Sequence, residues 1–91
     1  MKFKFEVGEL EKHLVEFSFN QLCGTLLICV DKKPVYQFTR LLNEPVREVF
    51  NFMVGEAERW PVRIEKRRKL LFGSRNILYV NHRLTRVVEG L

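Results

Sequence analysis

The residues with the clearest chemical potential form a basic tract at positions 59–69, where six of eleven residues are Lys or Arg. Such cations contact phosphates, and a neighbouring aromatic ring can stack on a base. On an alternating strand, Arg63, Arg67 and Lys69 project from one face, with Trp60 or Tyr79 available for stacking. The tract therefore predicts a candidate nucleic-acid site made of Arg59, Trp60, Arg63, Lys66, Arg67, Arg68 and Lys69.

A second interpretation of the same tract is structural, and we favour it. Glu58 and Glu65 interrupt the positive charge, and Trp60 fits the edge of a core with its N–H near solvent. Lys and Arg on a solvated strand also discourage pairing between exposed sheet edges. Nucleic-acid binding is therefore the alternative hypothesis.

Catalytic and metal-binding patterns are missing from the sequence. His13 and His82 are the only histidines, and the polar or charged residues beside them are typical of surface positions. Neither Ser18 nor Ser74 lies in a G-x-S-x-G turn, and the five glycines form no phosphate-binding loop. We expect no catalytic residue, no metal site and no cofactor, hence a protein that is not an enzyme.

Two smaller features have simple interpretations. Glu56 and Glu58 lie close together and could bind Ca²⁺ or exchange protons, but nearby Arg59 favours solvated loop charges. Cys23 and Cys29 fit neither a zinc pattern nor a disulfide framework. Cys29 follows an apolar run, so we expect it to be a small buried hydrophobic residue.

Composition predicts one soluble domain over residues 1–91. Hydrophobic residues make up 46% of the 91 residues, enough for one core, and no segment has the composition of a linker, an internal repeat or a low-complexity tract. The formal net charge of +5 attracts polyanions at long range but identifies no partner. No secretory signal or membrane-spanning run is evident, so we expect a cytoplasmic protein without a membrane partner.

Alternating apolar and polar residues predict strands through most of the chain. The pattern begins with Phe3, Phe5 and Val7 and continues with Val15, Phe17 and Phe19. Residues 25–30 are apolar on both faces, which is typical of a central strand covered on two sides. Further strands are expected near 35–39, 62–65, 76–80 and 84–88. The prediction is an all-β fold: a small antiparallel β-sandwich, or a partly open barrel, of seven to eight short strands.

Residues 43–60 fit two periods. As a helix, the segment would begin at Asn43 and present Val46, Phe50, Met53 and Trp60 along one side. As a strand, Phe50, Phe52 and Val54 alternate with Asn51 and Met53, and Gly55 begins a turn. Gly55 costs a helix about 1 kcal/mol relative to Ala, so we favour the strand.

Several stretches resemble the β-sandwich domain of the Fas apoptotic inhibitory molecule family. They are residues 15–17 and 27–33, the Phe50 to Gly55 step, residues 62–64 and residues 78–81. Lys32 and His82 stand where the family usually has Gly. The resemblance implies a cytosolic, non-catalytic interaction domain without a cofactor. We therefore expect a protein-interaction or scaffold domain, with self-association through an uncovered sheet edge as one form of partnership.

Overall fold

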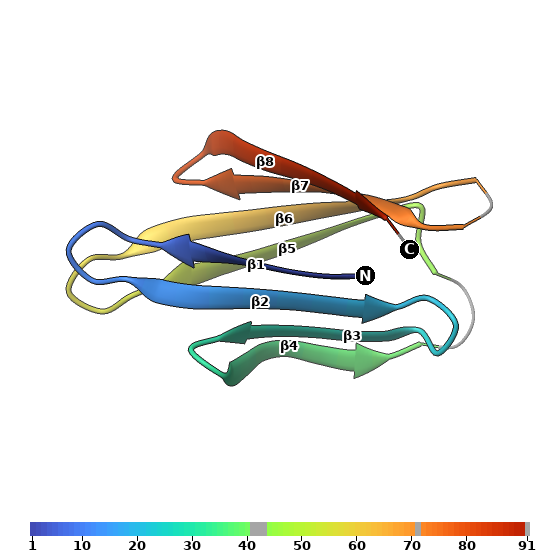
Figure 1. The fold of residues 1–91 in the computed structure, drawn as a ribbon, viewed down its shortest axis with the longest axis horizontal. Helices are drawn as coiled ribbons and strands as arrows, with labels where there is room; N and C mark the ends of the chain where they lie inside the picture. The colour runs from blue at the N-terminus through green and yellow to red at the C-terminus, as the bar shows by residue number, and fades with distance from the viewer. Residues whose placement is uncertain (41–43, 71, 91) are drawn as a thin grey trace.

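The computed structural model describes residues 1–40, 44–70 and 72–90 and contains eight strands and no helix within them. The chain folds into two four-stranded antiparallel sheets with the orders β1-β2-β3-β4 and β5-β6-β7-β8 (Figure 1). The prediction of an all-β sandwich is confirmed. The strands are β1 Lys2–Val7, β2 His13–Asn20, β3 Thr25–Val30, β4 Lys33–Thr39, β5 Arg47–Val54, β6 Trp60–Arg68, β7 Ser74–Val80 and β8 Arg83–Gly90.

The core lies between the two sheets and is made by the inward side of each alternating strand. The rings of Phe3 and Phe17 stack across β1 and β2, with their centroids 4.7 Å apart. Tyr36 of β4 meets Phe50 of β5 edge to face at 5.2 Å, which joins the first sheet to the second. The buried apolar residues are Phe3, Val7, Val15, Phe17, Phe19, Leu26, Ile28, Phe50, Val54, Val62, Ile64 and Leu78.

The ambiguous segment is a strand. Residues 47–54 form β5, which pairs with β6 so that Phe50 lies opposite Ile64. The strand period of two holds here, and the helical period does not, because Phe50 and Val54 are both buried against the first sheet. Asn43, the predicted helix start, lies outside the described residues.

Two expectations about exposed and covered surfaces are wrong. Cys29 is only partly buried, because it alternates with buried Ile28 and points to the outer side of β3, where no second layer packs. The basic tract does not protect a sheet edge, since β6 lies between β5 and β7. The edge strands are β1, β4, β5 and β8.

The two sheets repeat one four-stranded design, contrary to the expectation of no internal repeat. The sequence Phe-x-Phe-x-Val-Gly-Glu-x-Glu occurs at 3–11 and again at 50–58. The third and fourth strands of each sheet carry a register shift at matching places, Ile28/Cys29 and Leu78/Tyr79. Matching residues of β1 and β5 are 47 positions apart in the chain, whereas matching residues of β3 and β7 are 50 positions apart. The difference arises because the β6–β7 hairpin is three residues longer than the β2–β3 hairpin. This insertion hides the repeat from a search for a fixed period.

Matching turns close the last hairpin of each sheet. Asp31 and Lys32 have φ values of 51° and 70°, and Asn81 and His82 have values of 52° and 64°. Two consecutive positive φ values are typical of the type I′ turn, whose twist suits a two-residue hairpin. Lys32 and His82 therefore occupy the left-handed conformation that Gly adopts at lowest cost.

Two carboxylates, one from each sheet, bind the backbone of the other sheet's loop at the end of the sandwich where β1 ends. The Glu58 carboxylate accepts hydrogen bonds from the backbone N–H groups of Glu9, at 2.7 Å, and Leu10, at 3.1 Å. In return, the Glu11 carboxylate accepts one from the N–H of Glu56 at 2.8 Å. We call Glu11 and Glu58 the carboxylate clasp. Each loop thus uses a carboxylate from the other sheet to satisfy its backbone.

Candidate interaction surface on the second sheet

The outer side of the second sheet gathers four arginines, of which three lie around one buried carboxylate and the fourth, Arg75, pairs with Glu89 at 3.4 Å. Arg47 on β5, Arg63 and Arg67 on β6, and Arg75 on β7 have side chains between 44% and 57% exposed. They alternate with core residues, so the period of two that builds the sandwich also sends them outward. Glu65 lies among them with its side chain 4% exposed. We call this surface the arginine face.

Glu65 organises the guanidinium groups. Its Oε1 accepts from Nε of Arg47 at 3.0 Å and from Nε of Arg67 at 2.7 Å, and Nη2 of Arg63 lies 4.0 Å from its Oε2. The Arg47 hydrogen bond is the main cause that lowers the pKa of the Glu65 carboxyl, with Arg67 adding to the effect. Glu65 in turn raises the pKa of the Arg47 guanidinium. One ionised carboxylate thus holds three arginines together on the outer side of the sheet.

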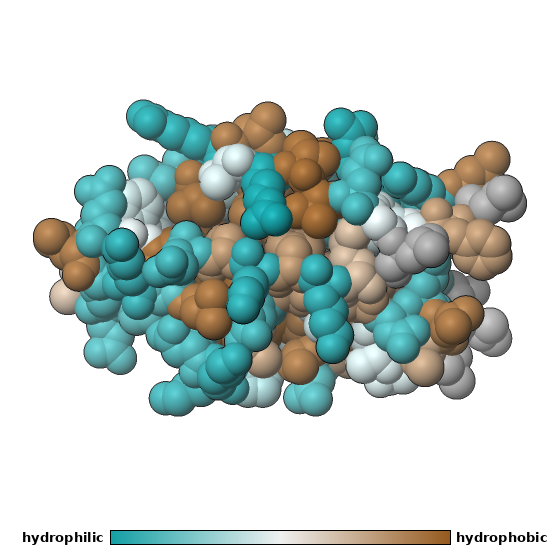
Figure 2. Space-filling model, viewed as in Figure 1, coloured by the Kyte–Doolittle hydropathy of each residue, from teal (hydrophilic) through white to brown (hydrophobic). Residues whose placement is uncertain are grey.

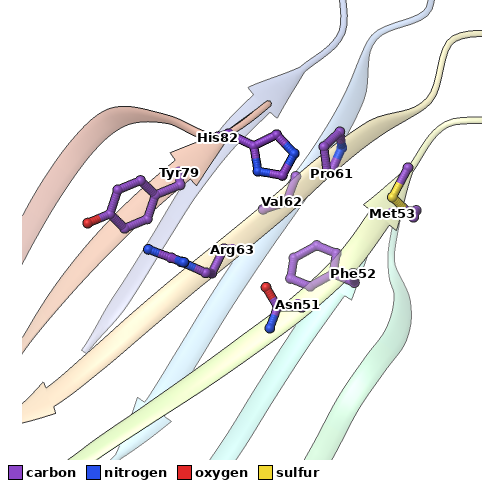
Figure 3. Close-up of a pocket in the computed structure, with 8 residues that line it drawn as sticks. All are labelled: Asn51, Phe52, Met53, Pro61, Val62, Arg63, Tyr79 and His82. Atoms are coloured by element: carbon purple, nitrogen blue, oxygen red, sulfur yellow. The ribbon is translucent and has the colours of Figure 1, made fainter.

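A hollow of about 410 Å³ opens beside Arg63 on the same side of the sheet (Figure 3). The Arg63 guanidinium lies over the Tyr79 ring, 4.3 Å from its centroid, which fixes one wall by a cation–π contact. Met53 is 48% exposed, so its thioether is available to an incoming group. The lining residues are Asn51, Phe52, Met53, Pro61, Val62, Arg63, Tyr79 and His82.

The structure divides the predicted nucleic-acid residues among several places. Arg63 and Arg67 share the arginine face, as the alternation predicted. Lys69 lies beyond the end of β6 and pairs with Glu89 at 3.1 Å. Arg68 is the exposed last residue of β6, and its N–H bonds the carbonyl of Val46.

Three other predicted residues lie away from this face. Arg59 is exposed in the β5–β6 loop, beside the clasp residue Glu58. Trp60 is partly buried and packs against the core, as the favoured interpretation predicted, but its Nε1 is buried and does not lie near solvent. Lys66 is buried with 1% of its side chain exposed, and its Nζ bonds the Glu44 carboxylate at 2.7 Å and lies 4.0 Å from the Phe19 ring centroid. The tract as a whole is therefore not one surface.

Sequence reasoning missed Arg47 and Arg75, which complete the arginine face. Both lie directly opposite Arg67 in the neighbouring strands. The available signal was the alternation of Arg63, Glu65 and Arg67, which identifies the outward positions of β6. The pairing register that adds Arg47 and Arg75 depends on hairpin lengths, and the three extra residues of the β6–β7 hairpin are not evident from local pattern.

His13 is more than a plain surface residue, because both of its ring nitrogens have carboxylate partners. Its Nδ1 lies 2.5 Å from Oδ2 of Asp31, and its Nε2 lies 2.7 Å from Oε1 of Glu11. Asp31 first and Glu11 second raise the pKa of the imidazole. Glu58 is likewise more than a solvated loop charge, because it holds the N–H groups of the β1–β2 loop.

Acidic and histidine side chains in the described residues form no group of three or more that could hold a metal ion. Within the same part of the chain, no helix is long and apolar enough to cross a bilayer. No protein-family model matches the chain, and searches of curated proteins and of solved structures found no match. The resemblance to the Fas apoptotic inhibitory molecule family stays a prediction from the sequence.

Proposed function

We propose that this protein is a non-catalytic protein-interaction domain, and that its binding surface is the arginine face with the adjoining hollow. The observation that carries the proposal is a mainly apolar hollow lined by the half-exposed Arg63, on the same side of the sheet as three further arginines. Interfaces favour arginine, tyrosine and methionine, which combine apolar contact area with hydrogen bonding. Arg63, Tyr79 and Met53 supply that combination here.

The side of the molecule that Figure 2 shows is mixed in polarity. Figure 2 shows that hydrophilic side chains dominate the visible face of the molecule, with smaller apolar patches between them. A surface of this kind fits a partner that associates and dissociates more readily than an obligate subunit. A second copy of the chain is one such partner, since β4 and β8 are edge strands with exposed Val35 and Leu84.

The experiment is site-specific photocrosslinking in the cells that make the protein. A benzophenone amino acid replaces Met53 at the hollow or, as the control, Leu27 on the outer side of the first sheet. We expect a defined protein adduct from position 53, absent when Arg63→Glu is added, and no matching adduct from position 27. Equal labelling from both positions, or none from position 53, would contradict the proposal.

A small nucleic-acid-binding domain is the second candidate, because Arg63 and Arg67 share one exposed face with Arg47 and Arg75. Phosphate contacts release counterions, so the affinity for a labelled oligonucleotide would fall steeply as salt rises. Arg67→Glu combined with Arg68→Glu would then remove binding. If the oligonucleotide shows no binding in a titration at low salt, the nucleic-acid function is excluded and the protein-interaction proposal is unaffected.

A further inference from the structure

The arginine face is ordered in rows that run across the strands. The pairing register aligns the outward residues of neighbouring strands, so each row contains one residue from each of β5, β6, β7 and β8. The row that begins at Arg47 contains three arginines side by side and is the first row, and the row that begins at Asn51 borders the hollow and is the third. The rows are Arg47-Arg67-Arg75-Glu89, Val49-Glu65-Ile77-Val87 and Asn51-Arg63-Tyr79-Leu84.

The charges of these rows do not balance. Four arginines face two carboxylates, Glu65 and Glu89, so the face has a surplus of two positive charges. Like charges directly opposite each other on neighbouring strands are destabilising, and Arg67 has an arginine on both sides. Glu65, which pairs with Arg47 and Arg67, and Glu89, which pairs with Arg75, relieve part of the repulsion, and the three arginine side chains remain about half exposed. An incoming anion would relieve the rest.

The surplus charge and the hollow are separated by a defined distance. Arg67 in the first row and Arg63 at the hollow are four residues apart on β6. Four residues of extended chain span about 13 Å. An extended peptide lying along β6 would therefore place one side chain in the hollow and another, four residues away on the same side, over the first row.

Peptide carboxylates fit this surface better than the phosphates and bases of a nucleic acid. A base needs an open aromatic face, but the Arg63 guanidinium already covers the Tyr79 ring, and Trp60 packs against the core. The hollow accepts an apolar side chain through Met53 and Pro61. Guanidinium groups meanwhile bind carboxylates through paired hydrogen bonds, as Arg47 already binds Glu65.

We infer that the partner contributes an extended acidic segment, with an apolar side chain in the hollow and a carboxylate four residues away on the first arginine row. This inference rests on the proposed function and adds the chemistry of the partner. The segment lies along β6 on the outer side of the second sheet. Its carboxylate replaces solvent at Arg67 and its neighbours.

The probe is a fluorescein-labelled decapeptide of Ser and Thr that carries one Phe and, four and six residues farther along, two Glu. Its binding to the full chain is followed by fluorescence anisotropy. Two control peptides carry Lys in place of both Glu or Ala in place of Phe. Protein variants are Arg67→Gln and Arg75→Gln, which remove charge without adding a carboxylate beside Glu65, and circular dichroism confirms that each is folded. Lys12→Gln, an exposed lysine in the β1–β2 loop, is the matched control for net charge.

We expect the acidic peptide to bind, the Lys peptide to show no binding, and each arginine variant to bind about tenfold more weakly. Lys12→Gln should stay within about twofold of the unchanged protein. Binding that depends on the Phe of the peptide but not on its Glu residues would overturn this inference and leave the proposed function standing. The inference of an acidic partner segment is wrong if the unchanged protein binds no peptide at low salt, or if it binds the Lys peptide as tightly as the acidic peptide.

Discussion

His13 is placed so that its protonation affects both sheets. Both ring nitrogens face carboxylate oxygens, Asp31 at 2.5 Å and Glu11 at 2.7 Å, and both can donate only as imidazolium. Glu11 also holds the N–H of Glu56 in the second sheet. The charged imidazole therefore orients one half of the carboxylate clasp.

Stability should depend on pH in a window that these groups define. The raised pKa of His13 means that its contribution is complete below the ordinary value of 6.5 and is lost as pH rises through the higher folded value. The pKa values of Asp31 and Glu11 are lowered, mainly by His13 and by the Glu56 N–H respectively. Their contributions are complete above their ordinary values of 3.8 and 4.5 and are lost as pH falls through the lower folded values.

Urea unfolding between pH 5 and pH 9 measures this effect. We expect the free energy of unfolding to fall as pH rises above 6.5 in the unchanged protein. His13→Gln should remove that fall, and His82→Gln, in the matching region of the second sheet, should preserve it. A fall that persists in His13→Gln would show that another group is responsible.

Glu58 and Glu56 provide a second comparison between single residues. Glu58→Ala leaves the N–H groups of Glu9 and Leu10 without their carboxylate, whereas Glu56→Ala removes an exposed side chain and keeps its N–H bonded to Glu11. We expect the melting temperature to drop for Glu58→Ala and to change little for Glu56→Ala. Equal melting temperatures for the two variants would mean that the clasp does not stabilise the loops.

Strand β6 carries a charge on its inward side, where its alternation calls for an apolar residue. Lys66 is buried beneath the Phe19 ring and bonds Glu44. Removal of the carboxylate alone leaves a buried cation without its partner, so Glu44→Gln should cost about 3 kcal/mol. The double variant Lys66→Met with Glu44→Gln should recover most of this loss, because Met fills similar volume without charge. Chemical denaturation of the two variants measures the difference, and a double variant no more stable than Glu44→Gln would contradict the account.

The two type I′ hairpins predict a stabilising change. Non-glycine residues pay about 1 kcal/mol in the left-handed conformation, so Lys32→Gly and His82→Gly should each increase the free energy of unfolding by about that amount. Lys33→Gly is the control because it places Gly inside β4, where the lost side-chain contacts and added chain entropy should destabilise the fold. Calorimetry of the three variants tests the assignment of the type I′ turns. The assignment is wrong if Lys32→Gly and Lys33→Gly change the free energy of unfolding by the same amount in the same direction.

At the level of the whole molecule, local pattern predicted the sandwich but not the features that join its sheets. Alternation placed Phe3, Phe17 and Phe50 correctly because it follows directly from the strand period. The same alternation did not predict that Lys66 is buried, since its burial depends on Glu44, which precedes β5 in the chain. The carboxylate clasp depends on contacts between residues 45 to 49 positions apart, which no local period can indicate.

The candidate site was predicted in part for the same reason. Arg63 and Arg67 follow from the alternation of one strand, whereas Arg47 and Arg75 depend on the pairing register of three strands. A comparison of the two halves would have shown the repeated motif and hence the twin sheets. The insertion in the β6–β7 hairpin conceals the rest of that relationship.

The most direct test of the account is to map binding onto the two sheets by NMR. Backbone amide shifts of the full chain would be followed while the acidic decapeptide is added at low salt. The account predicts shift changes at Asn51, Arg63, Arg67 and Tyr79 on the second sheet and none at Ser18, Leu27 or Cys29 on the first. Changes centred on the first sheet, or spread evenly over both, would contradict it.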